Sequence, residues 1–295
     1  AWVNTTAQNQ QVIGWLNTAV FLETGDEMQA QGWSPLVLDS NGNGRRDAYT
    51  EPGESSDSAK DTRIRSGFYG VSVDPNDGSV WGSSLGMPGA LLRFVPGDNP
   101  SSTGLTEIYE VPWENPRAAV QGYSPRGMDI DRNGVVWTPL ASGHLASFDR
   151  GACTGPLNGP TATGQHCPEG WTLYEEPLPK MKGITESGSS EGSYYAWVDQ
   201  FDTSGLGANT PISTGNASEG LLALRNGEWV VLRVPYPLGF YTKWMDGRID
   251  DPDAGWKGKG LWATWSTRAP FHAETGKGTS SKVVKFQMRP DSLAK

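Results

Sequence analysis

Two stretches of the chain alternate apolar and polar residues in nearly the same way. Residues 70–81 read GVSVDPNDGSVW, and residues 127–137 read GMDIDRNGVVW. Apolar side chains recur at every second position, which places Val71 and Val73 on one face of the first stretch. Each stretch also contains an Asp-Gly or Asn-Gly pair, where glycine supplies the positive φ that a tight turn needs. Each stretch therefore predicts two antiparallel strands joined by a turn.

The same alternation continues beyond both stretches and forms a repeat. Four strands are predicted in each copy, at residues 69–74, 79–84, 90–95 and 106–111 and then at residues 125–130, 135–140, 144–149 and 171–176. A four-stranded antiparallel unit that recurs every 40 to 60 residues or so, roughly as here, is typical of propeller blades. We predict an all-β fold, a β-propeller of four-stranded antiparallel blades.

Weaker copies precede and follow these two blades. The first 50 residues and residues 239–290 each contain three strand patterns. In the remaining copy we expect GITES (183–187) as the first strand, followed by strands within residues 193–201, 219–227 and 228–235. About five blade units are thus predicted in one propeller domain, at residues 1–50, 67–113, 123–179, 183–236 and 239–290.

Two three-stranded remnants at the ends do not comfortably close a ring, and an open sheet edge invites association. Either the two ends complete each other, or the chain is the C-terminal part of a larger propeller, or another protein chain completes it. Between the strands, only residues 18–32 show a helical period, and they predict one short surface helix.

Composition narrows the range of partners. The net charge is −9, which disfavours nucleic acid because phosphate binding needs clustered Lys and Arg. No stretch approaches the roughly 18 apolar residues of a membrane span. The chain has 13 Trp, and we expect some of them to line a cleft. A small molecule, a carbohydrate, a peptide or another protein is the expected partner.

The two cysteines, Cys153 and Cys167, bracket a polar loop rich in Gly, Pro and Thr. This arrangement predicts a disulfide, which would contribute about 3 kcal/mol by loop entropy. The alternative is two free thiols in a reducing compartment. A disulfide favours an extracellular or periplasmic location, and the absence of Cys-X-X-Cys gives no support to redox or zinc-ribbon chemistry.

Residues 39–51, DSNGNGRRDAYTE, match much of a calcium-binding loop. Oxygen side chains stand at positions 1, 3, 5 and 9, and glycine at position 6 permits the sharp turn. Thr50 stands at position 12, where a bidentate Glu is expected, and Glu51 follows one residue later. We predict a structural Ca²⁺ held by Asp39, Asn41, Asn43, Arg45, Asp47 and Glu51. The alternative is an Asx-rich turn without a metal.

The loops into the first strands and those between second and third strands emerge on one face of a propeller. These loops carry aromatic and charged residues, so the sequence predicts a ligand-binding mouth there. Residues 199–218 and 266–278 are expected to be two of the second-to-third loops. The expected ligand-binding residues are Tyr69, Tyr123, Asp199, Tyr241 and Arg268. The candidate catalytic residues are His144 and His272 as general bases, with Arg126 and Lys243 to stabilise an oxyanion.

Each of these residues also has a purely structural explanation. His144 could hydrogen-bond a neighbouring loop, His272 could be solvated, and Arg126 could stack on a tyrosine. Two functions therefore stay open: a non-catalytic module that binds a carbohydrate, peptide or protein, and a lyase or hydrolase assisted by a second divalent metal in the channel. His166 is expected to be structural, and the Trp of each Val-Trp repeat is expected to pack between blades.

The phrases YGVSVDPNDGSVWGS and PRGMDIDRNGVVWTPL resemble repeats of virginiamycin B lyase-like propellers. The resemblance is good over residues 67–150, and residues 15–51 are similar to a stretch in uncharacterised secreted bacterial propeller proteins. It implies a propeller of six or seven blades. For the lyase family it also implies metal-assisted opening of a cyclic ester with a histidine base. His144 and His272 match that family only in approximate location.

Overall fold

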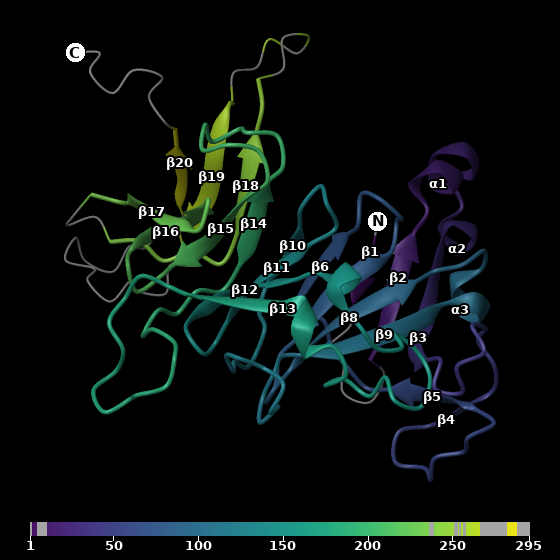
Figure 1. Cartoon of the computed structure of the whole chain (residues 1–295). Coiled ribbons are helices and arrows are strands. Elements are labelled where there is room, and N and C mark those ends of the chain that lie inside the picture. The colour runs from purple at the N-terminus through teal and green to yellow at the C-terminus, as the bar shows by residue number, and fades with distance from the viewer. Residues whose placement is uncertain are drawn as a thin grey trace. The chain divides into compact units, whose positions relative to one another are not determined.

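The computed structural model describes residues 2–4, 11–235, 239–250, 253, 255, 258–265 and 282–287. The chain divides into two compact units, Ala1–Met128 with Phe148–Thr172 and Asp129–Ser147 with Leu173–Lys295. Strands dominate in both units, and the described helices are short segments in the connections (Figure 1).

The first unit begins with a three-stranded antiparallel sheet, β1 (Trp2–Asn4), β2 (Val12–Leu16) and β3 (Gln31–Leu38). Two helices, α1 (Thr18–Thr24) and α2 (Glu27–Ala30), lie between β2 and β3, where the sequence predicts one. The helical segment is interrupted because Gly25 adopts the left-handed conformation and ends α1. Asp26 then caps α2 by accepting the N–H groups of Met28 and Gln29.

The next blade is a four-stranded antiparallel meander and confirms the strands predicted from the first stretch. It comprises β6 (Gly70–Val73), β7 (Val80–Ser84), β8 (Ala90–Val95) and β9 (Leu105–Glu110), with α3 (Pro100–Thr103) before β9. The predicted turn between β6 and β7 is closed by Asp74, whose carboxylate accepts the N–H of Asn76, and by Gly78 with a φ of 73°.

A connecting segment with two additional strands lies between the first two blades. Strand β4 (Tyr49–Thr50) runs parallel to β5 (Asp61–Ile64), and β5 pairs antiparallel with β3. One parallel bridge, from Leu38 to Thr106, joins β3 to β9. The predicted calcium loop lies between β3 and β4, and β5 pairs with both of these strands.

The Trp of each Val-Trp repeat stacks on a tyrosine in the fourth strand of its own blade. Trp81 lies 5.9 Å from Tyr109, and Trp137 lies 5.8 Å from Tyr174, measured between ring centroids. Trp81 also lies 6.1 Å from Phe148, which belongs to the third strand of the following blade. The repeated Trp is thus a packing residue both within a blade and between blades.

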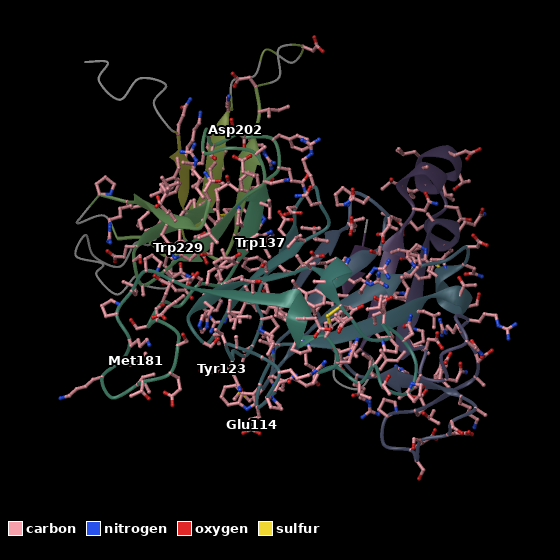
Figure 2. All side chains as sticks on the ribbon, in the orientation of Figure 1. Glu114, Tyr123, Trp137, Met181, Asp202 and Trp229 are labelled. Atoms are coloured by element: carbon pink, nitrogen blue, oxygen red, sulfur yellow. A yellow bond between two sulfur atoms is a disulfide. The ribbon has the colours of Figure 1, made fainter. Side chains whose placement is uncertain are left out.

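The third blade confirms the strands predicted from the second stretch. Its sheet has the order β10 (Asp129–Ile130), β11 (Val136–Leu140), β12 (His144–Phe148) and β13 (Trp171–Glu175). Two 3-10 helices, η1 (Arg150–Ala152) and η2 (Pro168–Gly170), lie between β12 and β13. Cys153 and Cys167 form the predicted disulfide, with Cα atoms 5.2 Å apart, and its sulfur–sulfur bond is drawn in yellow in Figure 2.

The fourth blade differs from the prediction. Its strands are β14 (Ala196–Asp199), β15 (Thr210–Gly215), β16 (Gly220–Arg225) and β17 (Glu228–Arg233). The prediction of a strand at residues 183–187 is wrong, and so is the prediction that residues 199–218 form one second-to-third loop. Strand β15 reads TPISTG, and all of its residues are buried. Because several of these buried residues are polar, the strand lacks the alternation of apolar and polar residues by which the other strands were predicted. The connection after Asp199 therefore runs from the first to the second strand.

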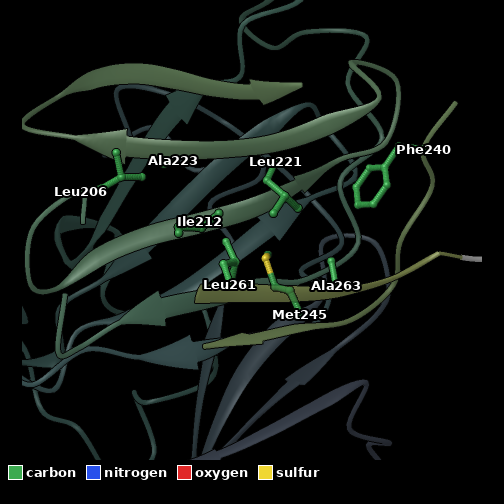
Figure 3. Close-up of a cluster of buried hydrophobic side chains, with 8 residues drawn as sticks. All are labelled: Leu206, Ile212, Leu221, Ala223, Phe240, Met245, Leu261 and Ala263. Carbon is green, nitrogen blue, oxygen red and sulfur yellow. The ribbon is translucent and has the colours of Figure 1, made fainter. Parts of the chain in front are cut away.

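The last three strands are β18 (Met245–Arg248), β19 (Gly260–Trp265) and β20 (Lys282–Phe286), as predicted. They share an apolar core with the fourth blade, shown in Figure 3: Leu206, Ile212, Leu221, Ala223, Phe240, Met245, Leu261 and Ala263. Each fully buried Leu or Ile in such a core contributes about 1.5–3 kcal/mol. A second cluster in this unit includes Trp137 and Trp229, both labelled in Figure 2.

The chain is an all-β protein of the β-propeller class. In the described residues, three blades have four strands, and the first and last have three in their meander. None of the helices described is long and apolar enough to cross a membrane. That one domain spans the whole chain stays a prediction.

Candidate functional site

The first strands of the three blades in the second unit, β10, β14 and β18, lie next to one another. Side chains connect the first two of these strands. The N–H of Val198 donates to Asp129 Oδ2 at 2.8 Å, and Gln200 Nε2 donates to the carbonyl of Ile130 at 2.7 Å. The ends of these strands are therefore held at fixed positions.

A groove of about 610 Å³ lies where β14 and β18 end, beside β10. It is lined by Asp129, residues 197–201, Thr203 and residues 246–250. This volume is within the range of roughly 300–1,000 Å³ that is usual for ligand sites.

Apolar side chains form much of the groove wall. Trp197 lies flat against Gly247, where a Cβ atom would lie 2.4 Å from the indole Cη2, so any larger residue would displace the ring. Phe201 and Ile249 are 71% and 63% exposed. The face of Phe201 is partly covered by Arg132, whose Cζ lies 5.4 Å from the ring centroid. Even so, Phe201 and Ile249 both expose a large apolar surface to solvent at the groove.

The loop after β14 is held by Asp199, which is fully buried. One of its oxygens accepts the N–H and hydroxyl of Thr203, at 2.8 and 2.9 Å. The other accepts the N–H of Ser204 at 2.7 Å and its hydroxyl at 2.5 Å. Asp199, predicted to bind ligand directly, positions the loop that carries Phe201. It lies at the end of the first strand, opposite to the end where the predicted mouth was placed.

The polar part of the groove consists largely of carboxylates. Asp129, Asp246 and Asp250 line it, with Arg248 as the one guanidinium among the described lining residues, and the oxygens of Asp199, which also borders the groove, are occupied by Thr203 and Ser204. Arg248 forms an ion pair with Asp246, and Asp250 accepts the N–H of Lys259 at 2.9 Å. Carboxylates only accept hydrogen bonds, so the groove is suited to a ligand that donates them.

The other residues predicted for the mouth are distributed over both units. Tyr69, Tyr123 and Arg126 belong to the first unit, where Tyr123 packs edge-on against Trp113 at 5.5 Å. In the second unit, Tyr241 lies 5.9 Å from Tyr194, and Lys243 Nζ lies 4.4 Å from the centroid of the Tyr194 ring. Tyr241 and Lys243 thus both contact Tyr194, which was not predicted to be part of the mouth, and a ligand-binding role for Tyr241 and Lys243 stays a prediction. Arg268 and His272 lie outside the described residues.

His144 is buried, with 1% of its surface exposed. Its Nδ1 is 3.1 Å from the Ser142 hydroxyl, and its Nε2 has no hydrogen-bond partner among the described residues. The backbone at Gly188 covers the ring, since a Cβ there would lie 3.1 Å from His144 Cε1. Burial lowers the pKa of His144, and smaller effects come from Glu175, which raises this pKa, and from Lys180, which lowers it. A role for His144 as a base stays a prediction and would require this loop to move.

His166 lies in the disulfide loop of the first unit. Its ring is 5.3 Å from that of Tyr109, and its Nδ1 accepts the N–H of Gly164 at 3.3 Å. Burial lowers the pKa of this histidine also. These contacts agree with a packing role.

The predicted calcium loop is tightly organised around Asp39, which is 2% exposed. Its carboxylate accepts three backbone N–H groups, from Gly42, Asn43 and Gly44. The Oδ1 of Asn43 accepts the N–H of Arg45 at 2.9 Å, and the amide groups of Asn41 and Asn43 donate to Asp47. Glu51 points to a different partner, because Arg63 Nη1 donates to both of its oxygens at 3.1 and 2.9 Å.

The groove was not predicted as a site from the sequence. Its signal was present as an aspartate in each of the three first strands, within MDI, WVD and MDG. The prediction placed residues 193–201 in the second strand of the fourth blade, whereas they contain the first strand, β14. Asp199 and the loop after it were therefore assigned to the other end of the blade.

No family model matches the chain, and no curated protein matches it. Solved structures to which it is similar include a streptogramin B lyase, at 12% identity and a TM-score of 0.42, covering 78% of this chain and 59% of that one. Another is a catalytically inactive virginiamycin B lyase from Staphylococcus aureus with quinupristin, at 12% identity and a TM-score of 0.42, covering 98% and 73%. A glucose dehydrogenase matches at 10% identity and a TM-score of 0.37, covering 98% and 96%.

The predicted resemblance to virginiamycin B lyases is confirmed at the level of structural neighbours. The chain spans 59% of the length of the first of these structures. Identities of this size assign no activity, so the function is argued from the groove itself.

Proposed function

We propose that the chain is a ligand-binding β-propeller module whose groove at the ends of β14 and β18 holds a basic peptide segment of a partner protein. The observation that carries the proposal is the combination of exposed apolar side chains with carboxylates in one groove. Phe201 and Ile249 supply apolar contact surface, and Asp246 and Asp250 supply acceptors. A lysine or arginine side chain has an apolar stem and a donor-rich end, so it matches both.

Electrostatics support the same class of ligand. Among the described lining residues, Asp129, Asp246 and Asp250 outnumber the one arginine, and the chain carries a net charge of −9. Such a field attracts a cationic segment and accelerates its association. Trp197 adds an aromatic surface for contact with a guanidinium or an apolar side chain.

A carbohydrate is the competing ligand, because its hydroxyl groups also donate to carboxylates and its rings stack on indoles. Sugar hydroxyls also need donors from the protein, and the groove wall supplies only a few, chiefly Arg248 and Gln200. Arg248 is engaged by Asp246, and Gln200 by the carbonyl of Ile130. The groove wall therefore favours a ligand that mainly donates hydrogen bonds.

The test is a fluorescence-polarisation screen of the full chain with dodecapeptides that carry a Lys-Leu-Arg centre in random flanks. Glu-Leu-Glu peptides and an arrayed glycan set are screened in parallel. We expect selection of basic peptides and a loss of affinity of about 10-fold or more for the Ile249→Ser, Asp250→Asn double variant, as for central contact residues. Groove-dependent glycan binding without peptide binding would overturn the peptide proposal.

The control is chosen to match the variant in composition and exposure. Leu22 and Glu23 are an adjacent apolar–acidic pair, exposed on α1 of the first unit. The double variant Leu22→Ser, Glu23→Gln changes the same kinds of side chain away from the groove. It should bind the selected peptide as the unmodified chain does, and a loss equal to that of the groove variant would assign the effect to surface charge alone.

The disulfide between Cys153 and Cys167 supports an extracellular or periplasmic location for this module, since such bonds persist in oxidising compartments. Alkylation of the natively isolated protein, with and without prior reduction, followed by intact mass measurement, tests this. Two alkylated cysteines without reduction would contradict it.

A further inference from the structure

The predicted calcium loop lacks an acidic residue at its twelfth position, and the structure offers a different carboxylate. Thr50 occupies the position and is buried, with its hydroxyl donating to the carbonyl of Asp61 at 3.3 Å. The next acid along the chain, Glu51, is held by Arg63. Neither residue is placed to complete the loop.

Asp61 stands at the start of β5, directly opposite Tyr49 in the parallel pair of β4 and β5. Its side chain is fully buried beneath the loop. Its Oδ2 accepts the N–H of Asp47 at 2.8 Å, so the carboxylate faces the loop residues. Its Oδ1 is buried and makes no hydrogen bond of good geometry among the described residues, although the backbone N–H of Asn41 also interacts with the Asp61 carboxylate.

A buried carboxylate oxygen without a partner is unfavourable unless something else compensates its charge. The charges of Asp39 and Asp47 both act on Asp61, and none of the ion pairs among the described residues includes any of the three, although the charge of Arg45 also acts on Asp47. Three neighbouring carboxylates without a cationic side chain paired to them favour a cation as the missing partner.

We propose that this loop binds one Ca²⁺ ion and that Asp61, reaching in from the neighbouring strand, supplies the carboxylate missing from the twelfth position. Asp39, Asn41, Asn43, the backbone carbonyl of Arg45 and Asp47 provide the other oxygens at their usual spacing.

The donor set fits calcium better than transition metals or magnesium. In the described part of the chain no three His, Cys, Asp or Glu side chains are grouped so that they could hold an ion by themselves, and this includes Asp39, Asp47 and Asp61. The site therefore depends on amide and backbone oxygens, which calcium accepts in sets of six to eight. Magnesium requires a near-octahedral set and keeps several waters, so it should bind more weakly here. On binding, the amide groups of Asn41 and Asn43, which now donate to Asp47, would turn their oxygens to the ion.

The test is calorimetric titration of CaCl₂ into the chelator-treated full chain, with Asp61→Asn and Glu51→Gln as a matched pair of charge-neutralising variants. We expect one ion per unmodified chain, a loss of about 10–100-fold in affinity for Asp61→Asn, and a change of less than about 3-fold for Glu51→Gln. Absence of binding at millimolar CaCl₂ would overturn the site. A loss in Glu51→Gln with none in Asp61→Asn would overturn the assignment of Asp61.

A measurement on the unmodified chain makes the result independent of how the variants fold. Hydrogen exchange is followed with CaCl₂ and with chelator. Calcium should slow exchange in residues 39–50 and equally in residues 60–64, because Asp61 would be fixed by the ion. Protection confined to residues 39–50 would show that Asp61 is not a ligand, and equal protection by MgCl₂ would contradict the selectivity.

Discussion

The guanidinium of Arg150 donates to both carboxylate oxygens of Glu107, Nε to Oε2 at 2.7 Å and Nη2 to Oε1 at 2.8 Å. Arg93 Nη1 donates to the same carboxylate at 2.9 Å, and so does the Tyr109 hydroxyl at 2.6 Å. Burial, followed by the charge of Glu107, raises the pKa of Tyr109, so this hydroxyl stays protonated and donates. The network joins β8 and β9 to the helix η1 within the first unit.

Glu107→Gln should destabilise the protein strongly. Glu107 is 6% exposed, and its loss leaves the two arginines without a buried counter-charge, at a cost of about 3–5 kcal/mol. The measurement is the free energy of unfolding in urea. Glu51→Gln is the control, since Glu51 also accepts two bonds from one arginine but has 46% of its side chain exposed, and should change stability by about 1 kcal/mol or less. Equal effects of the two variants would show that burial does not determine the contribution of these pairs.

Removing the disulfide should also destabilise the first unit. Cys153 and Cys167 close a loop with a sequence separation of 14, and the double variant to Ser should lose about 3 kcal/mol through the greater entropy of its unfolded chain. Unfolding in urea, with and without dithiothreitol, measures this. The reductant should lower the stability of the unmodified chain and leave that of the double variant unchanged. If the reductant has no effect on the unmodified chain, the bond does not stabilise the fold.

Much of the fold could be predicted because its strands face a core on one side and are joined by glycine-containing turns. The four strands β6 to β9 were predicted to within one residue at each end for this reason. Strand β15 was missed because several of its buried side chains are polar. Ser213 donates to Glu176 Oε1 at 2.7 Å, so a buried carboxylate replaces the apolar neighbour that the pattern requires.

The residues proposed to be functional were harder to predict, because they are brought together by strand pairing and not by spacing along the chain. Asp61 lies 14 residues after Asp47, and only the pairing of β4 with β5 places it under the calcium loop. The groove has the same origin, since Asp129 and Asp250 are distant in sequence and line one groove because β14 contacts both β10 and β18. The oxygen side chains of residues 39–47 lie close together in the sequence, so a calcium loop could be predicted there from spacing alone, and its metal stays a prediction.

The stability of the protein should fall below pH 6.5 because of His144. Its folded pKa is lowered by burial, so the unfolded chain takes up a proton near pH 6.5 while the folded chain stays neutral. This contribution is fully present above pH 6.5 and is lost as the pH falls towards the folded pKa. Between pH 8 and pH 5 the loss should be on the order of 1 kcal/mol. His144→Gln should remove it, so the free energies of unfolding of the two proteins should converge at pH 5, and parallel pH profiles would contradict the assignment.

Binding of a basic peptide to the groove should weaken with salt. The attraction to Asp250 and Asp246 acts across solvent at the open edge of the groove, where screening shortens the range of a charge from about 30 Å at 0.01 M to about 8 Å at 0.15 M ionic strength. We expect the dissociation constant to rise by about 10-fold or more between 0.02 and 0.5 M NaCl. Asp250→Asn should reduce this salt dependence, whereas Ile249→Ser should weaken binding equally at every salt concentration because the lost contact is apolar. A dissociation constant that does not change with salt would mean that the carboxylates of the groove do not recognise the ligand.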